Sequence, residues 1–370
     1  MNPQQLEAVK YNDGPLLIIA GAGTGKTTTL VEKVHHLINQ NLAKPEEILA
    51  LTFTEKAAQE METRVDERLP YGYTQTWIST FHSFADTILR TDISHIGLSP
   101  GYRLMTEAET ISFLRERLFM FDLKYFRPLG NPNKFLSSLL QHISRLRDED
   151  VTPEDYQKWV DQAGADDVEP EELQKRRELA HVYKVYQEIK VKEAVFDYGD
   201  LIHYLLVLFR KRPNILNQYR KQFKYILVDE FQDTNIAQYA MVKLLAPPES
   251  NPKLTVVGDD SQAIYKFRGA SVSNILTFMK DFPTAKNVSL LTNYRSDQAI
   301  LDHAYRLIKF NDPDTLEAQL GISKKLVASR NMEPAMDVEG PTGTAKKKPS
   351  SAKKATNAIV DFFVSNRVDE

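Results

Sequence analysis

A short glycine-rich stretch, AGAGTGKT at residues 20–27, has the residue types and spacing of a phosphate-binding loop. Its glycines let backbone N–H groups turn inward around anionic oxygens at the start of a helix. Lys26 would reach the β- and γ-phosphates of a nucleotide, and the Thr27 hydroxyl would bind Mg²⁺. The residues expected to contact the nucleotide here are Ala20, Gly21, Ala22, Gly23, Thr24, Gly25, Lys26, Thr27 and Thr28.

Two acidic residues end the hydrophobic run ILVDE at 226–230. A strand that ends in this way is typical of a Walker B segment, in which Asp229 would hold Mg²⁺ through water. Glu230 would polarise the attacking water as a general base. An acidic pair at a strand end is often only a solvated turn, so the assignment depends on the phosphate loop upstream. The pair lies about 200 residues after Lys26, and an inserted segment explains that distance.

Short apolar runs alternate with helical patterns around these residues, as a parallel sheet covered by helices requires. From about 93 to 195 the strand signals vanish and amphipathic helical patterns take over. We therefore predict one α/β domain interrupted by an inserted helical domain. The predicted strands lie within residues 14–20, 46–54, 74–84, 224–230, 253–260 and 287–294.

The composition is that of a globular protein, with 42% hydrophobic and 26% charged residues. The formal net charge of −3 gives no global basic signature, although a DNA-binding enzyme can confine positive charge to one groove. The lack of cysteine excludes disulfides and thiolate metal sites. The sequence shows neither a secretory signal pattern nor an apolar run of membrane-spanning length, so a cytoplasmic protein without a membrane partner is expected.

The segment DEFQDT at 229–234 resembles the form found in UvrD/Rep/PcrA-type superfamily 1 DNA helicases. Other short segments resemble further motifs of that family, in the family's order, over residues 2–296. Any one of them alone is a weak signal, whereas the ordered set is specific. The matching segments are NPQQLEAV (2–9), AGAGTGKT (20–27), LTFTEKAAQEM (51–61), TFHSF (80–84), DYGDLI (197–202), VVGDDSQAIYKFRGA (256–270) and NYRS (293–296).

The resemblance implies a RecA-like P-loop NTPase fold, that is, an α/β parallel sheet with an inserted all-α domain. It also implies a second motor domain that would close on ATP bound between the two. The expected division is 1–92 for the first part of the ATP-binding domain, 93–195 for the helical insertion, 196–285 for the second part, and 286–370 for the truncated beginning of the second motor domain, with a basic linker at 341–355.

The same resemblance assigns roles around the nucleotide. Gln5 would read the adenine edge, and Tyr294 would stack on the base. Gln262 would contact the γ-phosphate and couple hydrolysis to DNA, and Arg295 would act as an arginine finger. The expected catalytic residues are Lys26, Glu230, Gln262 and Arg295. A polar N-terminal residue remains the alternative for Gln5, and a surface turn remains the alternative for the NYRS segment.

A second set of residues is expected to face single-stranded DNA. Tyr265 and Phe267 would stack on bases, which tolerates any sequence because every base has a π-face. The family usually has Trp where Phe267 stands, and core packing is the alternative role for both rings. Arg268 would lie near the nucleic acid and the ATP site, and a lone His82 is often structural. The expected DNA-binding residues are Thr52, Phe53, Thr54, His82, Tyr265, Phe267 and Arg268.

The family's activity is 3′ to 5′ translocation on single-stranded DNA, with unwinding at single-strand/double-strand junctions, driven by ATP and Mg²⁺. This chain departs from the family pattern in two ways. Thr28 replaces the arginine that packs on the base in relatives, and no pattern of motifs V or VI follows residue 296. We therefore expect an N-terminal half that lacks its C-terminal motor domain in cis. The oligomeric state and the role of the lysine-rich 346–354 segment stay open.

Three alternatives remain. The chain could be an ATP- and DNA-binding fragment with little turnover, because motif VI normally supplies a second arginine to the phosphates. It could be the helicase arm of a RecB/AddA-like helicase–nuclease. A nucleotide kinase is more remote, since a kinase does not need the aromatic segment around Tyr265.

Overall fold

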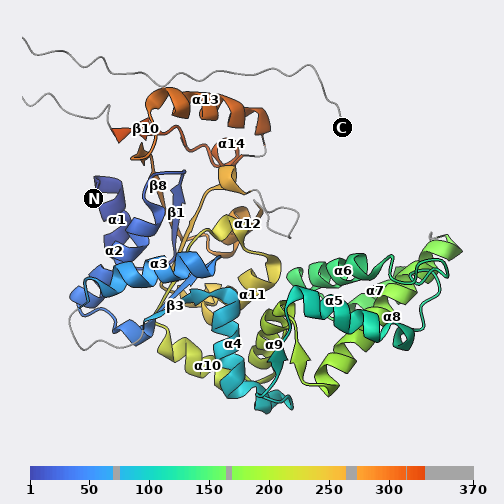
Figure 1. The fold of residues 1–370 in the computed structure, drawn as a ribbon. Helices are drawn as coiled ribbons and strands as arrows, with labels where there is room; N and C mark the ends of the chain where they lie inside the picture. The colour runs from blue at the N-terminus through green and yellow to red at the C-terminus, as the bar shows by residue number, and fades with distance from the viewer. Residues whose placement is uncertain (70–75, 164–168, 264–272, 314, 330–370) are drawn as a thin grey trace, which may run out of the picture.

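A parallel β-sheet forms the centre of the molecule (Figure 1). The computed structural model describes residues 1–69, 76–163, 169–263, 273–313 and 315–329. Within these ranges the large sheet has six strands in the order β3-β2-β6-β7-β1-β8, and each neighbouring pair runs parallel. The strands are β1 (Leu16–Ala20), β2 (Ile48–Thr52), β3 (Trp77–Thr80), β6 (Tyr225–Val228), β7 (Leu254–Gly258) and β8 (Lys286–Leu290).

The inner strands are buried along their whole length, because helices cover both faces of this sheet. Alternate residues of β1 point to opposite faces, so Leu16 and Leu17 belong to two different hydrophobic cores. One face packs against α1 (Pro3–Lys10), α2 (Lys26–Asn39) and α3 (Glu55–Asp66). The other packs against α4 (Phe81–Asp92), α9 (Tyr198–Lys211), α10 (Pro213–Gln222), α11 (Ile236–Leu245) and α12 (Ser273–Asp281).

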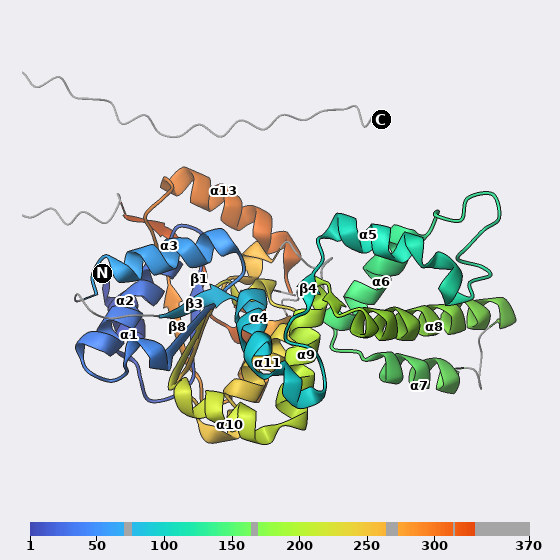
Figure 2. The same cartoon turned by 60° about the horizontal axis from the view of Figure 1, so that its bottom comes forward.

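The chain between α4 and α9 is mostly helical and projects to one side of the sheet (Figure 2). It has a hydrophobic core of its own, so it is an insertion and not a further layer of the sheet. A pair of short parallel strands, β4 (Arg103–Leu104) and β5 (Val195–Phe196), lies where the insertion joins the rest. The main helices of the insertion are α5 (Glu107–Glu116), α6 (Leu136–Asp148), α7 (Pro153–Ala163) and α8 (Pro170–Lys192).

These observations confirm the predicted fold class, an α/β parallel sheet with a helical insertion. One strand differs from the sequence-based division of the chain. The predicted division puts residues 286–290 in a second motor domain, whereas β8 pairs with β1 over its full length and forms an edge of the first sheet. The physical reason is that Val288 and Leu290 extend the core beneath α1 and α2. The short β4 was also not predicted, because two residues carry no periodic signal.

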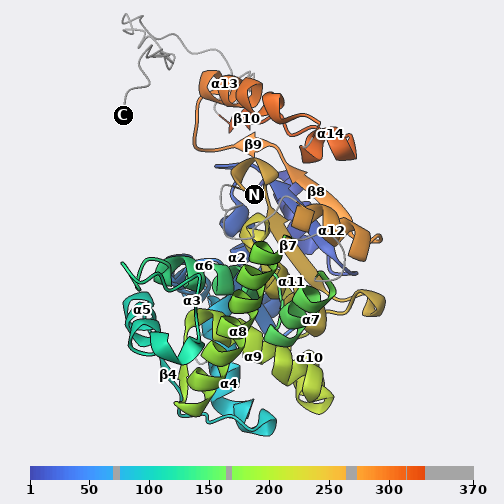
Figure 3. The same cartoon turned by 90° about the vertical axis from the view of Figure 1, so that its right-hand side faces the viewer.

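The chain after β8 turns back over the end of the sheet. Figure 3 shows its elements grouped together there, beside the N-terminus. A second small parallel pair, formed by β9 and β10, anchors this segment. Its elements are β9 (Thr292–Asn293), α13 (Gln298–Ile308), α14 (Leu316–Leu320) and β10 (Val327–Ala328). The predicted basic linker at 341–355 lies outside the described residues. Among the described residues, no helix is long and apolar enough to cross a membrane.

Candidate nucleotide and nucleic-acid site

The glycine-rich loop connects the end of β1 to the start of α2, as the sequence predicts. Gly23 and Gly25 have φ values of 73° and 85°, a left-handed conformation that favours glycine. A Cβ at Gly23 would lie 2.7 Å from Cβ of Arg295, and one at Gly25 would lie 2.8 Å from Nε2 of Gln5. The loop is therefore a tight backbone cradle that any side chain at these positions would fill. Such a cradle at a helix N-terminus fits an anionic oxygen.

Lys26 begins α2 and is buried, with 8% of its surface exposed. Its Nζ lies 2.8 Å from Oε2 of Glu230 and donates a 3.1 Å hydrogen bond to Oε1 of Gln262. These three residues come from segments that follow β1, β6 and β7. Because the carboxyl ends of parallel strands meet at one edge of a sheet, residues far apart in sequence converge here. Three of the four predicted catalytic side chains are thus in direct contact.

Thr27 and Asp229 provide a pair of oxygen ligands beside Lys26. The Thr27 hydroxyl donates a 3.2 Å hydrogen bond to Oδ2 of Asp229. Burial, with a contribution from the Glu230 carboxylate, raises the pKa of Asp229 to about 6. A hydroxyl and a carboxylate are the hard oxygen ligands that Mg²⁺ prefers, and a cation would offset that raised pKa.

Three features of the DEFQDT segment distinguish it from a plain turn. Glu230 has a φ of 47°, a strained conformation for a glutamate and one that recurs at functional sites. Its carboxylate is held by Nε2 of Gln232 at 2.7 Å as well as by Lys26. Oδ1 of Asp233 is buried without a hydrogen-bond partner in the described part of the chain. An unsatisfied carboxylate oxygen beside Glu230 fits a site that takes a polar ligand.

Among the described residues, no three His, Cys, Asp or Glu side chains gather into a metal cage. Mg²⁺ bound with a nucleotide does not need such a cage, because it takes one or two protein ligands and completes its shell with phosphate oxygens and water. Thr27 and Asp229 fit that arrangement.

The NYRS segment lies directly on the phosphate loop. Nδ2 of Asn293 donates a 2.6 Å hydrogen bond to the Ala22 carbonyl, and the backbone N–H of Tyr294 donates to the Gly23 carbonyl at 2.8 Å. The side chains of Tyr294 and Arg295 are exposed. The structure therefore places both predicted residues at the rim of the loop, and their roles stay predictions.

The N-terminal helix also contacts the loop. Gln5 is buried, and its Nε2 donates a 3.1 Å hydrogen bond to the Thr24 carbonyl. Asn2 caps the same helix and donates from Nδ2 to the Tyr294 hydroxyl at 3.1 Å. Gln5 and Tyr294, both predicted to contact adenine, thus lie on one side of the site. Thr28 is exposed beside them.

Sequence reasoning missed several residues that build this site. Asp259 accepts a 2.7 Å hydrogen bond from Nε2 of Gln262 and so orients that amide. Gln232 bridges Glu230 and the Asp259 N–H. Lys324 forms ion pairs with Asp259 and Asp260. The first two lie inside quoted motifs and could have been chosen as polar neighbours, whereas Lys324 has no local signal.

The structure describes four of the seven residues that are predicted to bind DNA. Phe53 and His82 are half-buried, Thr54 is exposed, and Thr52 is buried with its hydroxyl bonded to the Thr54 carbonyl at 3.1 Å. His82 packs edge-on against Tyr198, with 6.1 Å between ring centroids, and burial lowers the pKa of its imidazole. Tyr265, Phe267 and Arg268 lie outside the described residues. The DNA-binding role of this set stays a prediction.

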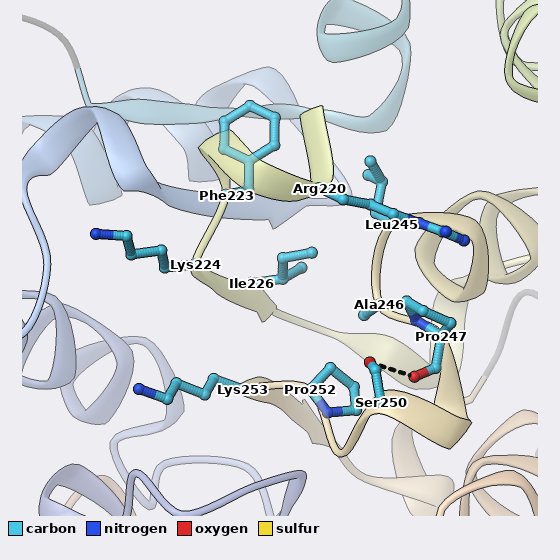
Figure 4. Close-up of a pocket in the computed structure, with 10 residues that line it drawn as sticks. All are labelled: Arg220, Phe223, Lys224, Ile226, Leu245, Ala246, Pro247, Ser250, Pro252 and Lys253. Atoms are coloured by element: carbon cyan, nitrogen blue, oxygen red, sulfur yellow. Dashed lines mark hydrogen bonds between the residues drawn. The ribbon is translucent and has the colours of Figure 1, made fainter. Parts of the chain in front are cut away.

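A separate hollow lies near the amino ends of β6 and β7 (Figure 4). No predicted site residue lines it, and its only drawn hydrogen bond joins the Ser250 hydroxyl to the Pro247 carbonyl at 2.8 Å. It is distinct from the nucleotide cradle, which lies at the carboxyl ends of the strands. The lining residues are Arg220, Phe223, Lys224, Ile226, Leu245, Ala246, Pro247, Ser250, Pro252 and Lys253.

A parallel sheet with a glycine-rich loop after β1 and an acidic pair after β6 defines a RecA-like P-loop domain, here with a helical insertion. The chain belongs to the UvrD/REP helicase N-terminal domain family, whose model matches residues 1–283. This finding confirms the resemblance stated from the motifs.

Individual relatives are similar over most of this chain. The ATP-dependent DNA helicase PcrA of Bacillus subtilis (strain 168) is 42% identical over 316 residues, which is 84% of this chain and 40% of the relative. PcrA of Staphylococcus epidermidis (strain ATCC 35984) and of Staphylococcus aureus (strain Mu50) are each 41% identical over 313 residues. The chain spans about 40% of the length of these relatives.

Proposed function

We propose that this chain is the ATP- and single-stranded-DNA-binding N-terminal half of a UvrD-type DNA helicase that acts in the cytoplasm. The parent activity would be ATP-driven 3′ to 5′ translocation on single-stranded DNA with unwinding at duplex junctions. The observation that carries the proposal is the contact of Lys26 with both Glu230 and Gln262 at the carboxyl edge of the sheet. Such convergence of a phosphate loop, an acid and an amide is what coupled nucleotide hydrolysis needs.

In this proposal the cradle residues from Ala20 to Thr28 bind the ATP phosphates, and Gln5 and Tyr294 hold the adenine. Lys26 neutralises phosphate charge, and Glu230 takes the proton from the attacking water. Glu230 Oε2 is also the Lys26 partner, so a phosphate that draws Lys26 away leaves that carboxylate available as a base. Arg295 would add positive charge at the γ-phosphate.

Thr27 and Asp229 would hold Mg²⁺, which supplies Lewis-acid neutralisation of phosphate charge when bound. The 3.2 Å hydrogen bond between the Thr27 hydroxyl and Oδ2 of Asp229 supports this part of the proposal, because it joins the two oxygen atoms that would bind the ion.

The DNA-binding part of the proposal rests on residues at the carboxyl ends of β2 and β3. Thr54 caps α3 and is exposed, and Phe53 and His82 lie close to the same edge of the sheet. Tyr265, Phe267 and Arg268 would complete this surface. Base stacking on such rings is worth about 1–3 kcal/mol per base.

We also propose the division of the chain into an ATP-binding domain (1–92 and 196 to about 290) with an insertion at 93–195. Moving the second boundary from 285 to about 290 takes account of the pairing of β8 with β1. The segment after it would begin a second motor domain. A helicase arm of a RecB/AddA-like helicase–nuclease shares all these features and remains the finer alternative.

The proposal is tested by ATP binding and by phosphate release from Mg²⁺–ATP with and without single-stranded DNA, using the 370-residue chain. We expect ATP binding, with DNA-stimulated turnover at least about tenfold below that of a full-length relative. The 370 residues hold no motif VI pattern to supply a second arginine to the phosphates, and one arginine finger can be worth ~10³ or more. The Lys26→Ala variant should bind neither ATP nor ADP tightly. No ATP binding by the unmodified chain would refute the proposed function. Turnover equal to a full-length relative would refute the expected deficit.

A further inference from the structure

Lys324 lies on the segment between α14 and β10 and reaches the nucleotide side of the sheet. Its Nζ is 2.5 Å from Oδ1 of Asp259 and 2.9 Å from the Ser261 hydroxyl, and it also contacts Oδ1 of Asp260. The Lys324 side chain is 10% exposed, and the two carboxylates are 4% and 3% exposed. A buried ammonium therefore bridges two adjacent buried acids.

The Lys324 ion pair continues directly to the phosphate loop. Asp259 uses Oδ1 for Lys324 and Oδ2 for Nε2 of Gln262, the latter at 2.7 Å. Gln262 in turn accepts from Lys26 at 3.1 Å through Oε1. The amide of Gln262 thus has its nitrogen turned to Asp259 and its oxygen turned to Lys26. One chain of polar contacts joins Lys324 to the lysine of the phosphate loop.

The backbone around Lys324 is fixed by several independent contacts. The N–H of Leu316 donates a 2.8 Å hydrogen bond to Oδ2 of Asp260. The side chain of Gln298 bonds the Leu326 carbonyl and the Ala328 N–H at 3.2 and 2.9 Å. A Cβ placed on Gly21 would lie 2.9 Å from Leu326 Cδ1, so this segment also packs on the phosphate loop. These contacts hold the backbone on both sides of Lys324 in place.

The loss of Lys324 would change the net charge beside the phosphate loop. Two neighbouring buried carboxylates need a counter-charge, and removing one partner of a buried pair leaves an uncompensated charge. The Lys324 ammonium and the Gln262 amide hold the pKa of Asp259 below its ordinary value despite burial. Without Lys324, a full negative charge would face the cradle and would compete with Gln262 for Lys26. A terminal γ-phosphate would feel that charge most strongly.

We propose that Lys324 is a positioning residue: by offsetting negative charge of Asp259 and Asp260 it keeps Gln262 turned toward Lys26 and sets the preference of the site for a triphosphate over a diphosphate. This inference rests on the proposed function, because it takes the Lys26 cradle as the nucleotide site.

The test compares dissociation constants of a non-hydrolysable Mg²⁺–ATP analogue and of Mg²⁺–ADP in the 370-residue chain. We expect Lys324→Met to weaken binding of the analogue by about tenfold, the size of one charge acting over several ångströms at intermediate dielectric. ADP binding should change much less, since ADP lacks the γ-phosphate. Lys324→Arg keeps the charge and should retain the unmodified ratio of the two constants. Lys325→Met is the matched control, because Lys325 is a largely exposed neighbour paired only loosely with Asp302 at 3.9 Å.

A second variant keeps the test decisive if Lys324→Met folds poorly. Lys324→Met combined with Asp259→Asn removes both charges while the new amide oxygen can still accept from Gln262, so the ATP-to-ADP ratio should return toward that of the unmodified chain. Equal losses for both nucleotides in the single and double variants, or a ratio like that of Lys325→Met, would overturn the inference. Failure of the unmodified chain to bind either nucleotide would instead refute the proposed function on which it rests.

Discussion

At the scale of single residues, the contact between Lys26 and Glu230 joins the two groups that the proposed chemistry uses most directly. The left-handed backbone of Glu230 carries its carboxylate to within 2.8 Å of the Lys26 ammonium. Nε2 of Gln232 donates a hydrogen bond to the same carboxylate oxygen, Oε2. An acid fixed in this way is oriented before any substrate arrives, which is how a general base gains its effect.

Replacing Glu230 by Gln should leave ATP binding within a few-fold of the unmodified chain and lower DNA-stimulated turnover by about 10²–10⁴. The amide keeps the size of the side chain but cannot accept a proton from water. Phosphate release and equilibrium ATP binding measure the two effects separately. The exposed Glu249→Gln serves as the control. Unchanged turnover in Glu230→Gln would remove Glu230 from the mechanism.

Lys33 gives a prediction that does not depend on catalysis. It is 1% exposed, its ammonium donates to the carbonyls of Ala8 and Tyr11, and burial lowers its pKa to about 8. Above this pH the folded chain releases a proton that the unfolded chain keeps up to its ordinary lysine pKa. Stability should therefore rise with pH through this window, by about 2 kcal/mol between pH 7 and 9.5.

Urea denaturation at pH 7 and at pH 9.5 measures this rise. It should be absent in Lys33→Met and present in Lys56→Met, whose lysine is exposed. The same pH slope in the unmodified chain and in Lys33→Met would show that Lys33 does not titrate in this range.

At the scale of elements, the phosphate loop is held by contacts with two segments, α1 and the segment that contains β9. The hydrogen bonds from Asn293 and Tyr294 to the loop carbonyls make the loop geometry depend on residues that the chain supplies much later. We therefore expect that a substitution in the loop that disturbs these contacts also destabilises the β9 segment.

Gly23→Ala should lower the free energy of unfolding more than Gly97→Ala, by about 1–3 kcal/mol. Both glycines have a left-handed φ, of 73° and 83°, so both variants carry the same kind of backbone cost. A Cβ at Gly97 meets nothing within 4 Å, whereas one at Gly23 would lie 2.7 Å from Arg295 Cβ. The difference between the two variants in urea denaturation isolates the contact with the NYRS segment. Equal effects would contradict that coupling.

Elements with a strong local signal were predicted from sequence. The apolar run before the glycines forms β1, as predicted, and the helix that follows the glycine-rich loop is α2, which buries Leu30, Val34 and Leu37. Which distant segments contact those elements was harder to predict from the sequence. Neither the pairing of β8 with β1 nor the ion pair of Lys324 with Asp259 follows from local pattern, because both depend on how distant segments meet.

At the scale of the whole molecule, a buried charge network connects the helical insertion to the sheet domain. Arg147 of α6 and Lys190 of α8 pair with Asp197 and Asp200 at the start of α9. The four charges balance, and Asp197 also accepts from the Tyr186 hydroxyl. Breaking one member of such a network is costly, because the remaining charge stays buried.

Lys190→Met should lower the free energy of unfolding by about 3–5 kcal/mol. Lys192→Met, two residues further along α8 and exposed, should change it little. Chemical denaturation followed by circular dichroism measures both. If Lys190→Met were as stable as Lys192→Met, the network would contribute nothing to joining the insertion to the sheet.

The strand order also constrains when the molecule can fold. The two neighbours of β1 in the sheet are β7 and β8, which the ribosome makes long after β1 has left it. The nascent phosphate loop therefore has no neighbouring strand beside β1 until residues 254–258 have emerged, while β2 and β3 can pair early. Contacts of such long sequence separation form slowly and leave apolar strands exposed in the meantime. During synthesis, β1 thus stays an unpaired apolar strand for longer than β2 does, and a chaperone that covers it would prevent aggregation.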